Sequence, residues 1–193
     1  MQEVNKFLSD YLNSFYQIDW LSPIISVFSD LPIFFLPIFL ITAWFYYAYK
    51  KDNESKKNLL FIFYSVVLAI IISYIIKNIH FVERPMSSLE NAWNLVLSKI
   101  PDASFPSDHA WVSISFLTAM YLFWYKKLSI IILPFFIIMN LSRVIGWIHW
   151  PLDIIVWIIN WIISASIVYK LRKLNIFKKV NNLLLKIASF LKL

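Results

Sequence analysis

The chain has 193 residues, of which 60% are hydrophobic and 15% charged, with one glycine, no cysteine and a formal net charge of +7. This balance excludes a disordered chain, a disulfide framework, thiolate metal sites and cysteine nucleophiles, and it is too apolar for an ordinary water-soluble domain. The basic residues are mostly lysines in short clusters beside apolar runs, which indicates anionic membrane lipids rather than nucleic acid as their partner.

The first residues carry an amphipathic pattern. Apolar side chains recur at spacings of three and four, opposite a polar face: Val4, Phe7, Leu8, Tyr11, Leu12 and Phe15. This pattern predicts a helix that lies in the membrane interface rather than crossing it. No basic stretch followed by a compact apolar region stands at the start, so we expect no cleaved signal peptide.

Uncharged apolar runs follow, and we predict that each belongs to a transmembrane helix. They cover residues 31–49, 59–76, 110–125, 128–142 and 154–169. The first two approach the roughly 20 residues that cross a hydrocarbon core, and the other three reach this length only if each helix continues through polar residues at one end. The expected fold is therefore a single all-α membrane domain over residues 1–193, built as a bundle of five transmembrane helices.

The last part of the chain repeats the amphipathic pattern with lysines added. Its apolar stripe consists of Ile176, Val180, Leu183, Leu184, Ile187 and Leu191. This predicts a basic amphipathic helix at the interface, with a solvated charged face as an equal alternative. Lysines cluster in 50–57, 126–127 and 170–173, and the positive-inside rule puts these segments and the C-terminus in the cytoplasm. Residues 77–109 and 143–153 then face outward.

Scarce ionisable residues gather in the two outward segments, at the outer ends of the predicted spans. They are Lys77, Arg84, His109, Arg143, His149 and Asp153. Charges at such depth are costly, so they usually have a partner or a task. Taken singly, Lys77 and Arg84 are also compatible with interfacial anchors, and His109 with an interface residue that has satisfied hydrogen bonds.

The spacing of these residues favours phosphate chemistry. His149 and Asp153 are four apart, so in a helix they share a face, and the carboxylate can fix the imidazole tautomer and leave the other nitrogen with a lone pair. Ser107 is a good helix N-cap, and the backbone N–H groups after it form an anion site. Three cations, a helix N-terminus and two histidines together suit a phosphoryl group.

Three strings in this region resemble the signature of the type-2 phosphatidic acid phosphatases. They are Lys77-x6-Arg84-Pro85, Pro106-Ser107-Asp108-His109 and Ser142-Arg143-x5-His149-x3-Asp153. The match covers residues 77–153 in the order and spacing of that family. These are metal-independent phosphatases, many of them integral membrane lipid phosphatases, so the resemblance implies neither a metal nor a cofactor.

The resemblance also implies a role for each matching residue. His149 is the nucleophile that forms a phosphohistidine, Asp153 orients it, and His109 protonates the leaving oxygen. The phosphoryl oxygens are bound by Lys77, Arg84 and Arg143, helped by Ser107 and the backbone at Asp108 and His109.

Asp108 departs from the family pattern, because many members have glycine there. A carboxylate at this position repels a phosphate unless it points away or pairs with a cation. The string Ser-Phe-Pro-Ser-Asp-His at 104–109 is, however, similar to the bacitracin-resistance type of undecaprenyl-diphosphatase, as are the small size and the outward-facing site. This similarity implies removal of the terminal phosphate of undecaprenyl diphosphate at the outer face of a bacterial inner membrane.

Several alternatives stay open at this point. The same chemistry fits phosphatidylglycerol phosphate, phosphatidic acid or lipid A. A lipid-phosphate transporter without turnover needs only the three cations, and a metal held by His109, His149 and Asp153 is compatible with the ligand types. The sequence does not predict the oligomeric state, nor whether the loop 86–102 closes over substrate as a lid.

Overall fold

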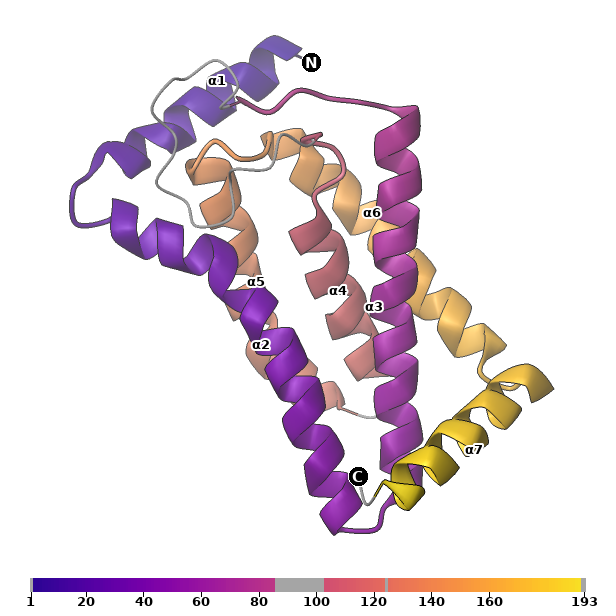
Figure 1. Ribbon diagram of the computed structural model, residues 1–193. Coiled ribbons are helices and arrows are strands. Elements are labelled where there is room, and N and C mark those ends of the chain that lie inside the picture. Colours follow the sequence, from indigo (N-terminus) through magenta and orange to yellow (C-terminus); the bar gives the residue numbers. More distant parts are fainter. Residues whose placement is uncertain (1, 86–102, 124, 192–193) are drawn as a thin grey trace.

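The computed structural model describes residues 2–85, 103–123 and 125–191, so the loop 86–102 and its proposed lid role lie outside the described residues. The described part is helical and contains no strand (Figure 1). Its elements are α1 (Gln2–Asn13), the 3-10 turn η1 (Ser14–Gln17), α2 (Ser22–Tyr49), α3 (Asn53–Ile79), α4 (Asp108–Leu122), α5 (Lys126–Ile145), α6 (Pro151–Leu171) and α7 (Asn175–Phe190). The all-α prediction is confirmed.

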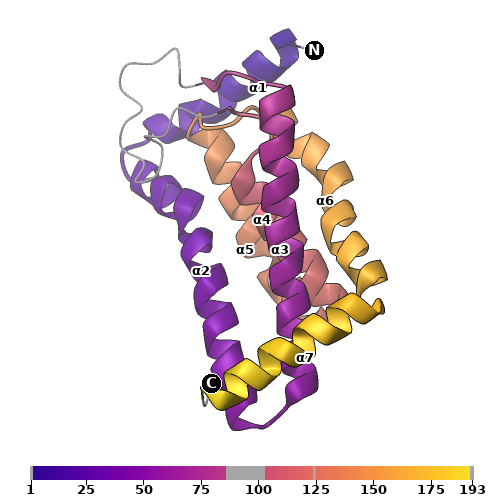
Figure 2. The same ribbon diagram turned by 45° about the vertical axis from the view of Figure 1, so that its right-hand side comes forward.

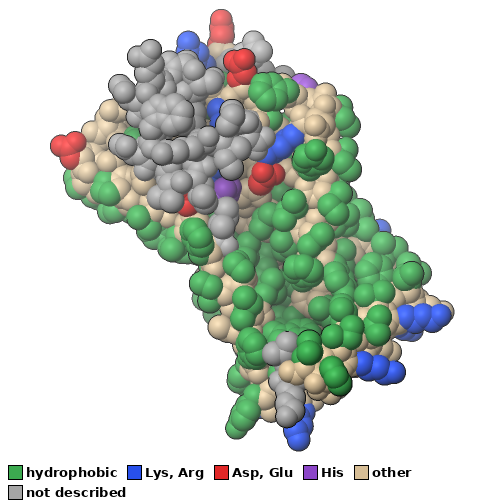
Figure 3. Space-filling model, in the orientation of Figure 1, with side chains coloured by type: hydrophobic (Ala, Val, Ile, Leu, Met, Phe, Trp, Pro, Cys, Tyr) green, Lys and Arg blue, Asp and Glu red, His purple; other side chains and the backbone are tan. Residues whose placement is uncertain are grey.

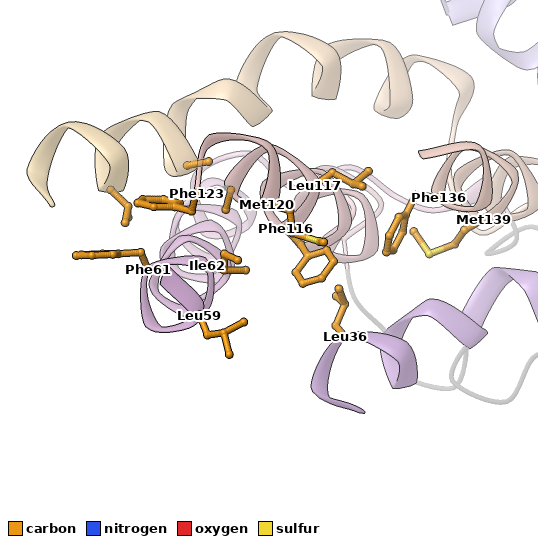
Figure 4. Close-up of a cluster of buried hydrophobic side chains, with 13 residues drawn as sticks. Leu36, Leu59, Phe61, Ile62, Phe116, Leu117, Met120, Phe123, Phe136 and Met139 are labelled. Carbon is orange, nitrogen blue, oxygen red and sulfur yellow. The ribbon is translucent and has the colours of Figure 1, made fainter. Parts of the chain in front are cut away.

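Helix α4 lies in the middle of the bundle and packs against α2, α3, α5 and α6 (Figures 1 and 2). The largest hydrophobic cluster surrounds it, and Ile62, Phe116, Met120 and Phe136 are almost wholly inaccessible there (Figure 4). Because α4 is enclosed by its neighbours, its first turn is fixed relative to the ends of the helices around it.

Buried serines also join three of these helices. The Ser115 hydroxyl on α4 donates to the Ser65 carbonyl oxygen on α3 at 2.9 Å, and it lies 2.8 Å from the Ser164 hydroxyl on α6. All three side chains are inaccessible to solvent. Small polar residues that bond across helices are typical of helix packing in membranes, where apolar burial gives little driving force.

The structure supports a smaller number of membrane spans than the sequence predicts. Among the described residues, α3 and α5 are long and apolar enough to cross a membrane, and α2 makes a third if its halves, which meet at 43°, form one span. Helix α4 has 15 residues. The helices α4, α5 and α6 do extend through the polar residues at one of their ends, as predicted, but five spans stay a prediction.

Helix α1 packs against the bundle with its polar side. The Asn13 side chain is buried and its Nδ2 donates to the Ile145 carbonyl oxygen at 2.8 Å, while the Trp147 Nε1 donates to the Ser9 carbonyl oxygen at 3.1 Å. The exposed side chains of α1 include the large apolar Val4, Phe7 and Tyr11, together with the charged Glu3, Lys6 and Asp10. Large apolar side chains exposed beside charged ones fit a helix at a lipid interface.

Helix α7 crosses α3 at the opposite end of the molecule (Figure 2). It is held there by the Tyr64 hydroxyl, which donates to Asn181 Oδ1 at 2.8 Å, and by Phe177 against Phe61. On the face seen in Figure 3, hydrophobic side chains cover the middle of the molecule and charged side chains gather toward its two ends. This surface is that of a membrane protein.

Candidate active site

The three sequence motifs come together at one end of the bundle, where α3 and α5 end and α4 and α6 begin (Figure 1). The segment after α3 is bonded to both of the other motifs. The Ser104 backbone N–H donates to the Val82 carbonyl oxygen at 2.7 Å, and Trp150 Nε1 donates to the Glu83 carbonyl oxygen at 2.8 Å. These bonds fix the backbone beside Arg84 against the segments that carry the histidines.

Ser107 occupies the N-cap position of α4, as predicted. Its side chain makes no capping hydrogen bond, and its Oγ is buried without a hydrogen-bond partner among the described residues. Buried hydroxyls normally have partners, so this one is available to a ligand at the start of α4. The first backbone N–H groups of the helix point the same way along its axis.

Asp108 pairs with a cation. Its Oδ2 lies 2.6 Å from Lys77 Nζ in the last turn of α3, and its Oδ1 accepts a hydrogen bond from the Ser73 hydroxyl at 2.6 Å. The carboxylate that departs from the family pattern is therefore held toward α3. This pairing removes the repulsion that the sequence raised as a difficulty.

Arg143 lies in the last turn of α5, which continues past Ser142 as predicted. The residue is 5% exposed, and its Nη1 donates to the Ser29 carbonyl oxygen at 3.1 Å and to Asp30 Oδ1 at 3.0 Å. His109, in the first turn of α4, places its Nε2 3.6 Å from the same carboxylate oxygen. The carboxylate of Asp30 thus contacts one predicted cation and one predicted catalytic histidine.

Asp30 was not among the predicted site residues. It stands directly before the uncharged run that begins at Leu31, where a charged residue is expected to mark the boundary of an apolar helix. In the structure α2 begins earlier, at Ser22, and Asp30 is a buried carboxylate within the helix. A carboxylate beside a long apolar run was the signal that could have identified it.

His149 and Asp153 would share a face only in a continuous helix, and the chain is not helical at His149. Trp150 has an extended backbone, with φ −74° and ψ 148°, and α6 begins only at Pro151. The two side chains approach because Asp153 caps the helix: its Oδ2 accepts from the Trp150 backbone N–H at 2.9 Å. This puts Oδ2 3.7 Å from His149 Nδ1, which is beyond a hydrogen bond.

The tautomer of His149 is set through Ser104. His149 Nδ1 lies 2.7 Å from the Ser104 carbonyl oxygen, and the Ser104 hydroxyl donates to Asp153 Oδ2 at 2.5 Å. A carbonyl oxygen only accepts, so Nδ1 carries the hydrogen and Nε2 the lone pair. The expected tautomer is obtained, but through a backbone group that sequence motifs do not reveal.

Burial keeps His149 neutral. The side chain is almost wholly inaccessible, and burial, followed by the positive charges of Arg143 and Arg84, holds its pKa well below the ordinary value of 6.5. The imidazole therefore keeps a lone pair at neutral pH, as a nucleophile requires. Arg84 is half-buried and close enough to act electrostatically on both His149 and Asp153.

The turn that carries His149 contains a residue in the left-handed region. Trp147 has φ 57°, whereas the preceding Gly146 has φ −79° and ends α5. For a bulky residue this conformation costs about 1–2 kcal/mol. The hydrogen bond from Trp147 to Ser9 therefore makes α1 part of what holds this turn in place.

The assembled site contains matching numbers of cations and carboxylates. The cations are Lys77, Arg84 and Arg143, and the carboxylates are Asp30, Asp108 and Asp153. Within the described part of the chain, no three histidine or acidic side chains are grouped so that they could hold one metal ion. A cationic cluster beside a neutral histidine can bind a phosphoryl group and attack it.

Comparison with known proteins gives the family. The model of the PAP2 superfamily matches residues 58–176, more than half of the chain. The chain belongs to the PAP2 superfamily. The PAP2 match contains the predicted site residues from Lys77 to Asp153, but it does not reach Asp30.

Two curated relatives resemble this PAP2 chain. The "Bacitracin transport permease protein BcrC" of Bacillus licheniformis is 28% identical over 152 residues, which are 77% of this chain and 70% of that protein. The "Undecaprenyl-diphosphatase BcrC" of Bacillus subtilis (strain 168) is 25% identical over 118 residues, 61% of this chain and 58% of that protein. No solved structure matches the chain significantly. These relatives support a lipid phosphatase of the BcrC-like branch.

Proposed function

We propose that the protein is a metal-independent membrane phosphatase that hydrolyses undecaprenyl diphosphate to undecaprenyl phosphate. The observation that carries the proposal is the neutral, buried His149, whose Nδ1 is bonded to a carbonyl oxygen and whose Nε2 therefore keeps its lone pair. The substrate is inferred from the name of one relative, the undecaprenyl-diphosphatase of Bacillus subtilis. Five transmembrane helices, a site facing outward and a cytoplasmic C-terminus in a bacterial inner membrane complete the proposal.

In the proposed reaction, Nε2 of His149 attacks the terminal phosphorus. The bond from phosphorus to the bridging oxygen breaks, and its electron pair stays on the departing undecaprenyl phosphate, which accepts a proton from His109. Lys77, Arg84 and Arg143 hold the other phosphoryl oxygens. Water then attacks the phosphohistidine, His109 takes its proton, and the P–N bond breaks to return the imidazole and release phosphate.

The contacts that Ser104 and Asp153 make around His149 favour catalysis over transport. A passage for lipid phosphates needs cations alone, whereas here Ser104 and Asp153 fix one nitrogen of His149 in addition. Transport without turnover is nevertheless the second candidate, because one relative is named a transport permease. The two candidates differ in whether purified protein releases phosphate.

The test is phosphate release from undecaprenyl diphosphate by detergent-purified protein. We expect turnover in excess EDTA, loss of turnover in His149→Ala, and normal turnover in His80→Ala, whose histidine is exposed at the end of α3. Turnover that EDTA abolishes and one divalent ion restores would refute the metal-independent mechanism. Turnover in His149→Ala would refute the nucleophile, and wild-type protein without any turnover would favour transport.

A substrate panel and a topology reporter test the remaining parts. We expect a higher kcat/KM for undecaprenyl diphosphate than for phosphatidylglycerol phosphate or phosphatidic acid, and the reverse order would reassign the substrate. A reporter fused after Leu193 should behave as cytoplasmic. A signal from the outer side would overturn the proposed orientation.

A further inference from the structure

The carboxylate of Asp30 connects two residues of the site from a helix that the family match does not cover. Asp30 is 6% exposed, and its Oδ1 contacts Arg143 Nη1 at 3.0 Å and His109 Nε2 at 3.6 Å. Its Oδ2 is buried without a hydrogen-bond partner among the described residues. A buried carboxylate with one unsatisfied oxygen is destabilising, so its presence calls for a compensating task.

The charged groups around His109 indicate what Asp30 does. Burial, followed by the positive charge of Arg143, lowers the pKa of His109 to about 4. The carboxylate of Asp30 contacts both groups and acts against this lowering. Two further charged or titratable groups act on the same ring: Asp108 in the same helical turn and His149 in the facing turn.

The position of Asp30 also bears on which ring nitrogen carries the hydrogen. His109 Nε2 lies 3.6 Å from Asp30 Oδ1, which is within ion-pair range but longer than a hydrogen bond, and Nε2 has no hydrogen-bond partner among the described residues. An ionised carboxylate can only accept, so its negative charge favours a hydrogen rather than a lone pair on Nε2, and the proton that moves during catalysis then belongs to Nδ1.

We propose that Asp30 is the positioning residue for His109: its carboxylate keeps Nε2 protonated and supports the ring when Nδ1 gives or takes a proton, while it holds Arg143 alongside. The proposal rests on the proposed function in one respect, namely that His109 is the proton-transfer residue. In the first half-reaction the proton passes from Nδ1 to the leaving oxygen as the P–O bond breaks. Nε2–H stays against Asp30 throughout.

The first experiment measures the protonation of the His109 ring in the absence of turnover. The chain has only three histidines, so their ring signals can be assigned by NMR from single-histidine variants of the full protein in detergent. We expect Nε2 of His109 to carry the hydrogen in the wild type. In Asp30→Asn, His109 should titrate about one pH unit lower or more, since an opposite charge at this distance shifts titration by about 1–3 units. Asp19→Asn is the matched control, because it removes an exposed carboxylate before α2.

The second experiment compares two substrates whose leaving groups differ in their need for a proton. General acid catalysis contributes about 10²–10⁴-fold, and only when the leaving oxygen needs a proton. Asp30→Asn should therefore lower kcat on phosphatidic acid, an alkyl ester, by about tenfold or more, and kcat on p-nitrophenyl phosphate, whose anion leaves unprotonated, by about threefold at most. KM should change far less than kcat on phosphatidic acid. Equal losses on both substrates would reject a role through His109.

The outcomes separate this inference from the proposed function. A bare Nε2 on His109 in the wild type would overturn the inference even if Asp30→Asn does not fold. Identical titrations of His109 in Asp30→Asn and Asp19→Asn would overturn it as well. If the titration shifts as expected but the wild type releases no phosphate from any lipid, the pairing of Asp30 with His109 stands and the proposed function fails.

Discussion

Replacing Asp108 by asparagine should strengthen the binding of a phosphate-like anion. In the structure Lys77 Nζ is held 2.6 Å from Asp108 Oδ2, and their side chains are 12% and 46% exposed. An incoming phosphate that recruits Lys77 must compete with this carboxylate. The substitution removes the competing charge but keeps the backbone N–H groups at the start of α4, which bind anions through the main chain.

The exposure of the pair sets the size of the effect. A partly exposed ion pair is worth about 0.2–1 kcal/mol, far less than its short distance would suggest in an apolar medium. If the binding of the anion gains the free energy of this ion pair, the inhibition constant falls by about 1.4- to 5-fold, since RT is about 0.6 kcal/mol.

The assay is inhibition of phosphate release by orthovanadate, at fixed pH and ionic strength. Glu54→Gln is the matched control, because it breaks the exposed pair with Lys57 at 2.7 Å and also removes one negative charge. Glu54 lies at the other end of α3, a 27-residue helix of about 40 Å, where screening over about 8 Å leaves no effect on the site. Weaker inhibition of Asp108→Asn, or inhibition equal to that of Glu54→Gln, would refute the competition.

Two further predictions concern pH and packing. Because the pKa of His149 is lowered in the folded protein, the unfolded state binds more protons in acid. Thermal stability should therefore fall as the pH drops below about 6.5, and it should fall less steeply in His149→Asn. A difference in stability between the two proteins that does not change with pH would contradict the lowered pKa. Ser115→Ala should lower the free energy of unfolding by about 0.6–2 kcal/mol by breaking the contacts with Ser65 and Ser164. Ser113→Ala, which removes a bond within α4 only, should cost less in a denaturation series, and equal losses would argue against the interhelical bonds.

Residues that mark helix ends were predictable because local rules govern them. The placement of Ser107 at the start of α4 and of Arg143 in the last turn of α5 followed from capping preferences and the ends of apolar runs. These rules act over one helical turn, so a single sequence contains the whole signal.

These local capping rules did not predict the backbone geometry at His149. A spacing of four residues fits both a continuous helix and a capping aspartate behind an extended residue, and only the second occurs at Trp150. The role of Ser104 was equally hidden, because the group that contacts His149 is its backbone carbonyl, which every residue has. A pattern of side chains cannot distinguish such a contact.

Long-range pairing explains why Asp30 was missed. It meets Arg143 across 113 positions of sequence, and no periodicity links two helices that far apart. The number of spans does not follow from the sequence for a related reason: the short α4 is enclosed by its neighbours, so its apolar composition reflects burial in protein as much as contact with lipid. Hydropathy does not separate these two surroundings.

The carboxylates of the site differ in how they can respond to a substrate. Three clustered cations repel one another, and the acidic partners offset that repulsion before a phosphate arrives. Asp108 is half-exposed, so when a phosphate binds Lys77 it can turn toward solvent at small cost. Asp30 is buried between Arg143 and His109, and separating it would leave an unpaired charge inside the bundle. On the proposed function, we therefore expect Lys77 to be the cation that changes partner when phosphate binds, and Arg143 to keep its carboxylate and bind the phosphate with its remaining donors.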